Sequence, residues 1–304
     1  MKVTYLNHSG FLLEWEHCYW IFDYYQGRIP RLDEKKTVFV FCSHSHGDHF
    51  NPAVFALAEA YPSVKYVFSA QVRPACRKLD RNVKGVHLSE KQIGEVCGAQ
   101  KTARDIARDG AGKAEGVQDM EARAGKIESA QDMKARAGKI ESASRIIPLP
   151  EITFLTSRTE TELSDGFGGQ LQIFTLRSTD CGCAFLIRYE GKTVYHAGDL
   201  HWWVWPGEPE KDNRQMTGNF KKEMEYLTGK TIDVVFAPLD ARLEEWYAKG
   251  LKYLLEHAKV SHVFPMHFWN EYSVMDRYLT ENPVPEGTEF HKISRDGQEW
   301  EITL

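Results

Sequence analysis

The sequence predicts a mixed α/β globular fold, on three observations. Short apolar segments with the composition of β-strands recur along the chain, and helical patterns lie between several of them. Of the 304 residues, 42% are hydrophobic and 27% are charged, which is an ordinary globular balance with ample material for a core. The length allows one large domain or two ordinary ones. We expect a single domain over residues 1–304.

Strands are expected where a short apolar or aromatic run is bounded by turn residues. The clearest is TVFVFC, whose uninterrupted apolar character is typical of a strand buried on both faces. In chain order the expected strands are Val3–Leu6, Phe11–Trp15, Tyr19–Asp23, Thr37–Cys42, Val64–Phe68, Val83–Leu88, Leu171–Leu176, Ala184–Tyr189, Thr193–Ala197, Ile232–Phe236, Val260–Phe264, Glu289–Ile293 and Glu299–Thr303. The last two flank an Asp-Gly turn, a sequence typical of β-hairpins.

Helical patterns occupy part of the remaining chain. The first should begin at Asn51-Pro52, because asparagine can cap a helix and proline fits its first position. The expected helices are Ala53–Ala60, Gln71–Leu79, Phe220–Leu227 and Glu244–Ala258.

The composition changes over about residues 98–144, where Ala, Gly, Lys, Arg and Glu dominate. This segment holds a tandem repeat of 13 residues, Gln118–Ala130 and Gln131–Ala143. Thirteen residues do not complete a whole number of helical turns, so one straight helix would place the apolar positions of the two copies on different faces. We interpret the segment as a low-complexity, solvated insertion that arose by local duplication, with a partner-binding arm as the alternative.

Charge and cysteine content argue against several classes of protein. The net charge of −5 and the lack of a Lys/Arg run give no reason to expect nucleic acid or a membrane surface as a partner. No apolar stretch approaches the roughly 20 residues of a membrane span, and the first residues lack the apolar core of a secretory signal. Six cysteines without paired zinc spacing fit a reduced compartment. We therefore expect a cytoplasmic protein that binds a small molecule, and a homo-oligomer is left open.

The strongest chemical signal is SHSHGDHF, which follows the predicted buried strand TVFVFC directly. Four potential ligands fall within six residues: His44, His46, Asp48 and His49. Imidazole nitrogen and carboxylate oxygen suit Zn, Mn or Fe better than Ca or Mg. Gly47 would allow a tight path between the ligands. The cluster predicts a metal centre that activates water for hydrolysis.

The pattern of an apolar strand followed by a potential ligand recurs at three later places. Leu171–Leu176 leads to Asp180, Thr193–Ala197 leads to Asp199, and Val260–Phe264 leads to His267. Functional groups of α/β folds gather on the loops past the strand ends. A single aspartate after a strand is commonly only a turn residue or a cap, but together with the cluster these three positions point to one site.

With these motifs in place, the sequence resembles the metallo-β-lactamase superfamily. SHSHGDHF, the later HAGDLH and the late PMHFW carry the resemblance, and the opening VTYLNHSGFLLEW with IFDYY is similar to the branch of ascorbate-6-phosphate lactonase-like hydrolases. It covers nearly the whole chain outside about residues 98–144. It implies an α+β fold, an αββα four-layer sandwich of two mixed β-sheets flanked by helices.

The resemblance also implies a dinuclear site for two divalent ions, with zinc favoured and manganese or iron as alternatives. His44 and His46 would bind the first metal, Asp48, His49 and His267 would bind the second, and Asp199 would bridge them. A metal-bound hydroxide would be the nucleophile. Asp48 and Asp199 are accordingly expected to be essential for catalysis, and Asp23 is expected to orient the metal loop.

One position departs from the family pattern. The family usually supplies a third histidine to the first metal from the loop before the later hairpin, where this sequence has Ser178-Thr179-Asp180-Cys181. We favour Asp180 as the substitute because carboxylate is a legitimate ligand and its loop is the appropriate one. The alternatives are Cys181, Cys183, His196 and His201.

Three further residues are expected to bind substrate. In the lactonase-like branch the turn that holds His8 tends to lie near the site. Trp202 and Trp203 follow a predicted ligand loop directly, where aromatic side chains can form a pocket wall, although they could equally pack the sandwich.

The function expected from these residues is metal-dependent hydrolysis of an ester, lactone or phosphoester bond in a small molecule. One alternative is a nuclease or RNA-processing phosphodiesterase of the same fold, which the acidic net charge disfavours. Another is a redox or non-catalytic metal-binding protein.

Overall fold

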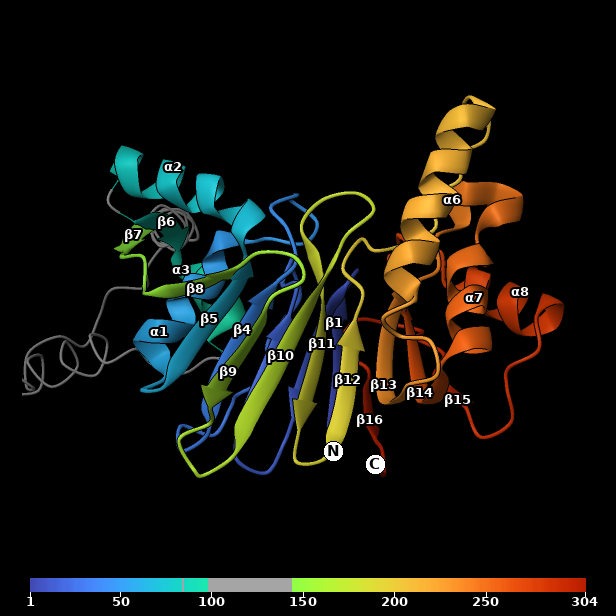
Figure 1. Cartoon of the computed structure of the whole chain (residues 1–304). Helices are drawn as coiled ribbons and strands as arrows, with labels where there is room; N and C mark the ends of the chain where they lie inside the picture. Colours follow the sequence, from blue (N-terminus) through green and yellow to red (C-terminus); the bar gives the residue numbers. More distant parts are fainter. Residues whose placement is uncertain (84, 98–143) are drawn as a thin grey trace, which may run out of the picture.

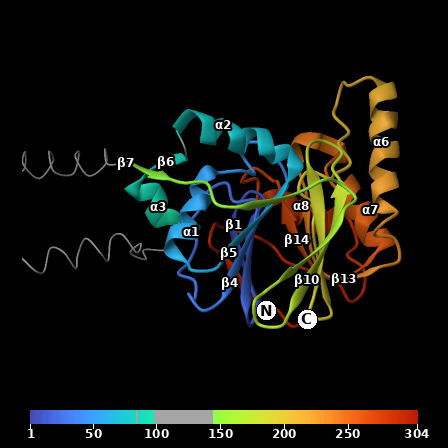
Figure 2. The ribbon, with the colours of Figure 1, turned by 60° about the vertical axis from the view of Figure 1, so that its left-hand side comes forward.

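The computed structural model describes residues 1–83, 85–97 and 144–304. Two seven-stranded sheets face each other (Figures 1 and 2), and a two-stranded sheet pairs β6 (Val86–Ser89) with β7 (Ser144–Ile147). The predicted insertion lies outside the described residues except for Ser144, which begins β7.

The first large sheet has the order β16-β1-β2-β3-β4-β5-β8. It is antiparallel from β16 to β3 and parallel from β3 to β8. Its strands are β1 (Lys2–Asn7), β2 (Gly10–Glu14), β3 (Cys18–Phe22), β4 (Thr37–Cys42), β5 (Val64–Ser69), β8 (Ile152–Leu155) and β16 (Glu299–Glu301). All six residues of β4 are buried, as its apolar run predicted.

The second large sheet has the order β15-β14-β13-β12-β11-β10-β9. It is antiparallel from β9 to β12 and parallel from β12 to β15. Its strands are β9 (Glu160–Ser164), β10 (Gln170–Arg177), β11 (Cys183–Tyr189), β12 (Lys192–His196), β13 (Thr231–Pro238), β14 (Lys259–Met266) and β15 (Glu289–Phe290).

Helices cover the two outer faces (Figures 1 and 2). The first sheet is flanked by α1 (Leu57–Ala60), α2 (Arg73–Val83) and α3 (Glu90–Val96), and the second by α6 (Glu210–Met224), α7 (Lys249–His257) and α8 (Ser273–Glu281). Three short 3₁₀ helices complete the secondary structure: η1 (Pro52–Ala56), η2 (Ala70–Val72) and η3 (Ala241–Trp246).

Aromatic side chains fill the space between the sheets. Phe41 of the first sheet meets Phe185 of the second with ring centroids 5.4 Å apart, and Phe11 meets Phe236 at 4.3 Å. Burying such rings is the main favourable term that holds two sheets face to face. The predicted αββα sandwich of two mixed sheets is therefore confirmed.

Several predicted elements differ from the structure. The last two strands do not form a hairpin: β15 pairs with β14 in the second sheet, whereas β16 pairs with β1 in the first. Helix α6 begins at Glu210, ten residues before the expected Phe220, because its first turns are polar and exposed and so give no apolar periodicity. Asn51 caps as predicted through Ala53 N, but the turn it opens is the 3₁₀ helix η1. Strands β7, β8 and β9 and helices α3 and α8 were not predicted.

Among the described residues, the helices are all too short or too polar to span a bilayer.

Candidate metal centre

Seven candidate residues or loops lie at the same edge of the sandwich, because each follows the carboxyl end of a strand. They are His8 after β1, Asp23 after β3, the segment 43–49 after β4, Asp180 after β10, Asp199 after β12, Asp240 after β13 and His267 after β14. His8, Asp23 and His267 adopt positive φ values of 54°, 40° and 62°. Residues other than glycine rarely do so, and such strain is concentrated at functional sites.

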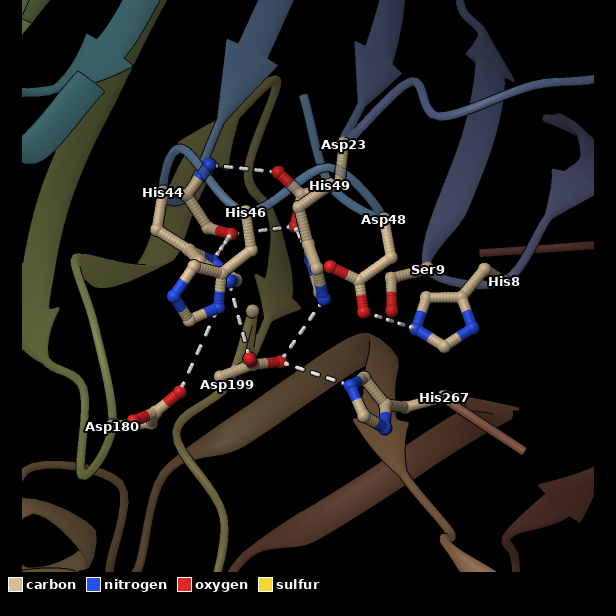
Figure 3. A network of polar contacts seen from close by, with 12 residues as sticks. His8, Ser9, Asp23, His44, His46, Asp48, His49, Asp180, Asp199 and His267 are labelled. Atoms are coloured by element: carbon tan, nitrogen blue, oxygen red, sulfur yellow. Dashed lines mark hydrogen bonds and ion pairs between the residues drawn. The ribbon is translucent and has the colours of Figure 1, made fainter. Parts of the chain in front are cut away.

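Asp23 orients two of the predicted ligands, and it lies above them in the view of Figure 3. Its carboxylate accepts hydrogen bonds from His49 Nδ1 at 2.8 Å, from Ser43 N at 2.7 Å and from Ser43 Oγ at 2.6 Å. Because the Ser43 hydroxyl hydrogen is used on Asp23, Ser43 Oγ must accept from His44 Nδ1, 2.9 Å away. Both imidazoles therefore carry their hydrogen on Nδ1, which leaves Nε2 of each ring as a free acceptor or ligand.

His267 is oriented in the same way by a residue that was not predicted. Its Nδ1 donates to Asp240 Oδ2 at 2.9 Å, so its Nε2 also carries a lone pair. A metal-binding histidine commonly donates its second nitrogen to a carboxylate, which fixes the tautomer and the ring direction.

The three free nitrogens surround the Asp199 carboxylate (Figure 3). Nε2 of His44 lies 3.2 Å from Oδ2, and Nε2 of His49 and His267 lie 3.2 Å and 3.5 Å from Oδ1. His44 Nε2, His49 Nε2 and Asp199 Oδ1 are buried and form no hydrogen bond within the described chain. Nitrogen lone pairs that face a carboxylate repel it, and a proton or a metal ion between them removes the repulsion. The donor set therefore fits a metal ion.

The electrostatics of the site favour a positive charge at this point. Burial alone would lower the pKa of His49, but Asp199 and Asp23 raise it to about 10, so without a metal ion Nε2 holds a proton toward Asp199 that a bound metal ion would displace. Burial alone would raise the pKa of Asp199, but His49, His44 and His267 hold it well below its usual range. The pKa of Asp23, which burial alone would also raise, is likewise lowered by its histidine neighbours. Asp23 and Asp199 thus stay charged in a buried site and stabilise a cation beside them.

A second group of possible ligands adjoins the first. His8, Asp48, His49 and His267 each offer one atom, and these atoms lie within 4.8 Å of one another. His8 Nε2 lies 3.4 Å from Asp48 Oδ2, and burial lowers the pKa of His8 to about 4. His8, expected to bind substrate, is therefore placed as a potential ligand as well.

The predicted third ligand of the first metal lies at the mouth of the site. Asp180 is half-exposed, with Oδ2 3.9 Å from His46 Nδ1, and it forms a possible ligand group with His46 and Cys181. His44, His46 and Asp48 form a further group. The structure thus brings together all seven residues that the sequence nominated as metal ligands, and their occupancy by metal stays a prediction.

Three alternatives to Asp180 are placed elsewhere. His196 uses both ring nitrogens, since Nε2 contacts Ser9 O at 2.9 Å and Nδ1 accepts from Gly198 N at 3.2 Å. His201 is buried against Gly250 and Trp203. Cys183 is buried at the start of β11. None of the three belongs to a potential ligand group among the described residues.

Two glycines let the ligand loops approach one another. A Cβ on Gly182 would lie 1.9 Å from Ser43 O, and one on Gly198 would lie 2.6 Å from Ser43 Cβ. Both have positive φ, of 73° and 50°. Gly47, in contrast, has open space around it and no positive φ, so the expectation that it shapes the ligand loop was wrong.

The ligands open into a cleft of about 370 Å³. Its lining is His46, Asp48, Thr179, Asp180, Asp199, Trp203, Trp205, Glu208, Met216, Arg242, His267 and Trp269. Trp203 lies on the wall as predicted and donates through Nε1 to Asp199 O at 3.0 Å. Trp202 does not line the cleft, because its indole stacks on Phe220 of α6 and donates to Thr217.

Asp240 and Arg242 are the residues that sequence reasoning missed. Arg242 lines the cleft, and its Nε and Nη2 donate to Asp240. The signal for Asp240 was available, since it follows the apolar strand Ile232–Phe236 just as the nominated ligands follow theirs.

Comparisons with known proteins give one relative by sequence. No family model matches the chain. A UPF0173 metal-dependent hydrolase of Pelotomaculum thermopropionicum is 29% identical over 124 residues, which are 40% of this chain and 52% of that protein. The match therefore spans about half the length of that relative.

Solved structures of similar arrangement are more distant in sequence. The metallo-β-lactamase fold protein YhfI of Bacillus subtilis has a TM-score of 0.49 at 12% identity over 98% of both chains. Igni18, a metallo hydrolase of Ignicoccus hospitalis, has a TM-score of 0.46 at 14% identity over 99% of both chains. The short form of human tRNase Z has a TM-score of 0.42 at 14% identity over 100% of both chains. At these values none of them assigns an activity to this chain.

Proposed function

We propose that this chain is a metal-dependent hydrolase of the metallo-β-lactamase superfamily that cleaves an ester, lactone or phosphoester bond in a small molecule. The observation that carries the proposal is the set of three Nε2 atoms, on His44, His49 and His267, that converge within 3.5 Å of the Asp199 carboxylate. The similarity to a metal-dependent hydrolase over 124 residues supports the same activity.

Two divalent ions would bind in this centre, with zinc favoured by the mixture of imidazole and carboxylate. One ion would be held by His44, His46 and Asp180, the other by Asp48, His49 and His267, and Asp199 would lie between them. A bound divalent ion supplies Lewis-acid chemistry and lowers the pKa of water toward neutrality. The contribution of the chain is to fix the ligands in advance: Asp23 holds His49 directly and His44 through Ser43, and Asp240 holds His267.

The cleft suits a small molecule with an anionic group. Its volume of about 370 Å³ falls in the range of small-ligand pockets. The Arg242 guanidinium lies 5.4 Å from the Trp205 ring centroid and 4.9 Å from that of Trp269, so aromatic faces hold it at the wall. Its Nη1 takes no part in the hydrogen bonds formed within the described residues, which leaves a donor for substrate.

Metal analysis is the first test. The purified full chain should contain stoichiometric transition metal, and Asp199→Asn and His49→Gln should lose it. His87→Gln is the control, because this histidine is exposed on β6, a strand of the small sheet that contributes none of the ligand loops. Absence of bound transition metal from the wild-type protein, after addition of zinc, would overturn the proposal.

Hydrolysis is the second test. The loaded protein is assayed on carboxylic esters, lactones, phosphomonoesters and phosphodiesters, and turnover on at least one class is expected. Asp48→Ala and Asp199→Ala should abolish it, whereas His87→Gln should not. Turnover that survived in both aspartate variants would show that the chemistry takes place elsewhere.

A further inference from the structure

A separate group of possible metal ligands lies away from the cleft, at the outer edge of the second sheet. His262 is in β14, Glu289 is its register partner in β15, and His291 follows β15 directly. One ligand atom from each lies within 4.8 Å of the other two. His262 precedes His267 by five residues of extended chain, which places it roughly 16 Å from the cleft.

The tautomer of His262 is fixed by its surroundings. Its Nε2 lies 3.0 Å from Thr303 O, and a carbonyl oxygen can only accept, so Nε2 carries the hydrogen. Nδ1 of the neutral ring therefore has a lone pair. This lone pair faces His291 Nε2 at 3.1 Å and Glu289 Oε2 at 3.3 Å.

The two neutral forms of His291 place different groups against His262 and Glu289. If Nδ1 carries the hydrogen, the Nε2 lone pair faces the lone pair of His262 Nδ1 at 3.1 Å. If Nε2 carries it, Nε2 donates an ordinary hydrogen bond to His262 Nδ1, and Nδ1 lies 3.8 Å from Oε1 of the exposed Glu289. In the metal-free chain the two rings are therefore joined by a hydrogen bond, and a metal ion would take the place of its hydrogen and bind both imidazoles and the carboxylate.

The spacing and rigidity of the group also suit a metal ion. Two nitrogens bound tetrahedrally to zinc at about 2.0–2.1 Å lie roughly 3.3 Å apart, so the observed 3.1 Å requires only a small adjustment. The His291 ring stacks on Phe264 with centroids 4.1 Å apart and planes 7° apart. Both imidazoles are buried and Glu289 is exposed, so the two nitrogens are preorganised and the carboxylate can close over the ion.

We propose that His262, Glu289 and His291 form a zinc site that is separate from the hydrolytic centre. Its two histidines and one carboxylate leave a fourth position for water. A bound ion would link β14 to β15 and, through Thr303, to the segment after β16. Its effect is therefore on the stability of this sheet edge.

The test uses the full chain with cleft ligands of both ions removed by His44→Ala, His49→Ala and Asp199→Ala, so that binding is measured without turnover. Equilibrium dialysis against zinc should find a bound zinc ion that depends on His262, Glu289 and His291. Adding Glu289→Gln or His291→Gln should weaken its binding by more than the roughly 10- to 100-fold typical of losing an outer-shell partner. Cobalt, added in place of zinc, should show the intense visible absorption of a tetrahedral ion, and this too should decrease.

Glu301→Gln is the matched control, because Glu301 is an exposed glutamate on β16 outside the group. Circular dichroism checks that each variant is folded, and the exposed position of Glu289 allows its variant to carry the test if His291→Gln unfolds. Zinc should raise the Tm of the cleft-depleted chain and of its Glu301→Gln form, but not of Glu289→Gln. Unchanged zinc affinity in Glu289→Gln would overturn the proposal and leave only a hydrogen bond between the two histidines.

Discussion

His267 Nδ1 donates a 2.9 Å hydrogen bond to Asp240 Oδ2, and Nε2 of the same ring lies 3.5 Å from Asp199. Asp240 thus decides which nitrogen of His267 faces the site. The two residues come from neighbouring parallel strands, β13 and β14, whose carboxyl ends lie side by side.

Removing this partner should weaken metal binding. We expect Asp240→Asn to lower zinc affinity about 10- to 100-fold, because an amide no longer enforces the hydrogen on Nδ1 of His267. Competition with a chromophoric chelator measures the affinity. Asp276→Asn, at an exposed position on α8, should leave it unchanged. Equal affinity in Asp240→Asn and wild type would show that the ring is held by its packing alone.

Gly182 should tolerate no side chain. Gly182→Ala should destabilise the chain by about 1–3 kcal/mol more than Gly191→Ala, through overpacking against Ser43. The pair is matched, since Gly182 and Gly191 have φ values of 73° and 75° but only Gly191 has open space around it. Urea unfolding gives the two free energies. Similar losses in both variants would mean that the cost comes from backbone strain and not from the approach of the loops.

Arg242 should affect binding more than turnover. Arg242→Ala is expected to raise KM for an anionic substrate about 10-fold or more while kcat changes little, because the guanidinium is at the wall of the cleft. Steady-state kinetics on the substrate class found in the hydrolysis panel measures both. Arg214→Ala is the control, since Arg214 pairs with Glu210 on the exposed face of α6. A lower kcat at unchanged KM would show that Arg242 stabilises the transition state and not the bound substrate.

Asp165 should make stability depend on pH in the acid range. Burial alone would raise its pKa, but hydrogen bonds from the Tyr189 hydroxyl and from the Phe167 and Gly169 amides lower it below its usual range. A lowered pKa stabilises the fold above the unfolded value of about 3.9, and this contribution is lost as pH falls through the folded value.

Asp165→Asn tests this dependence. The variant should be less stable by about 1–3 kcal/mol at pH 7, and it should lose less stability than wild type between about pH 5 and pH 3. Denaturant unfolding at each pH provides the values, with Glu286→Gln at an exposed position as the control. Parallel pH profiles for Asp165→Asn and wild type would exclude Asp165 as the source.

Much of the fold could be read from local patterns. TVFVFC gave β4 with its observed bounds, because a strand buried on both faces needs an uninterrupted apolar run. Helix α6 was placed too late, because its exposed first turns carry no apolar periodicity. The last two strands show the limit of such patterns: their Asp-Gly turn is typical of a hairpin, yet pairing with β14 and β1 separates them into two sheets.

The sequence by itself determined the candidate metal centre. His44, His46, Asp48 and His49 are close in the chain, and a ligand after each of three later strands must reach the same edge once the strands run in parallel. Only the tertiary structure decided which atoms face the site, because the direction of each imidazole depends on a partner remote in sequence. Asp23 fixes His49, Asp240 fixes His267, and the packing of Gly182 and Gly198 on Ser43 sets how closely the loops approach.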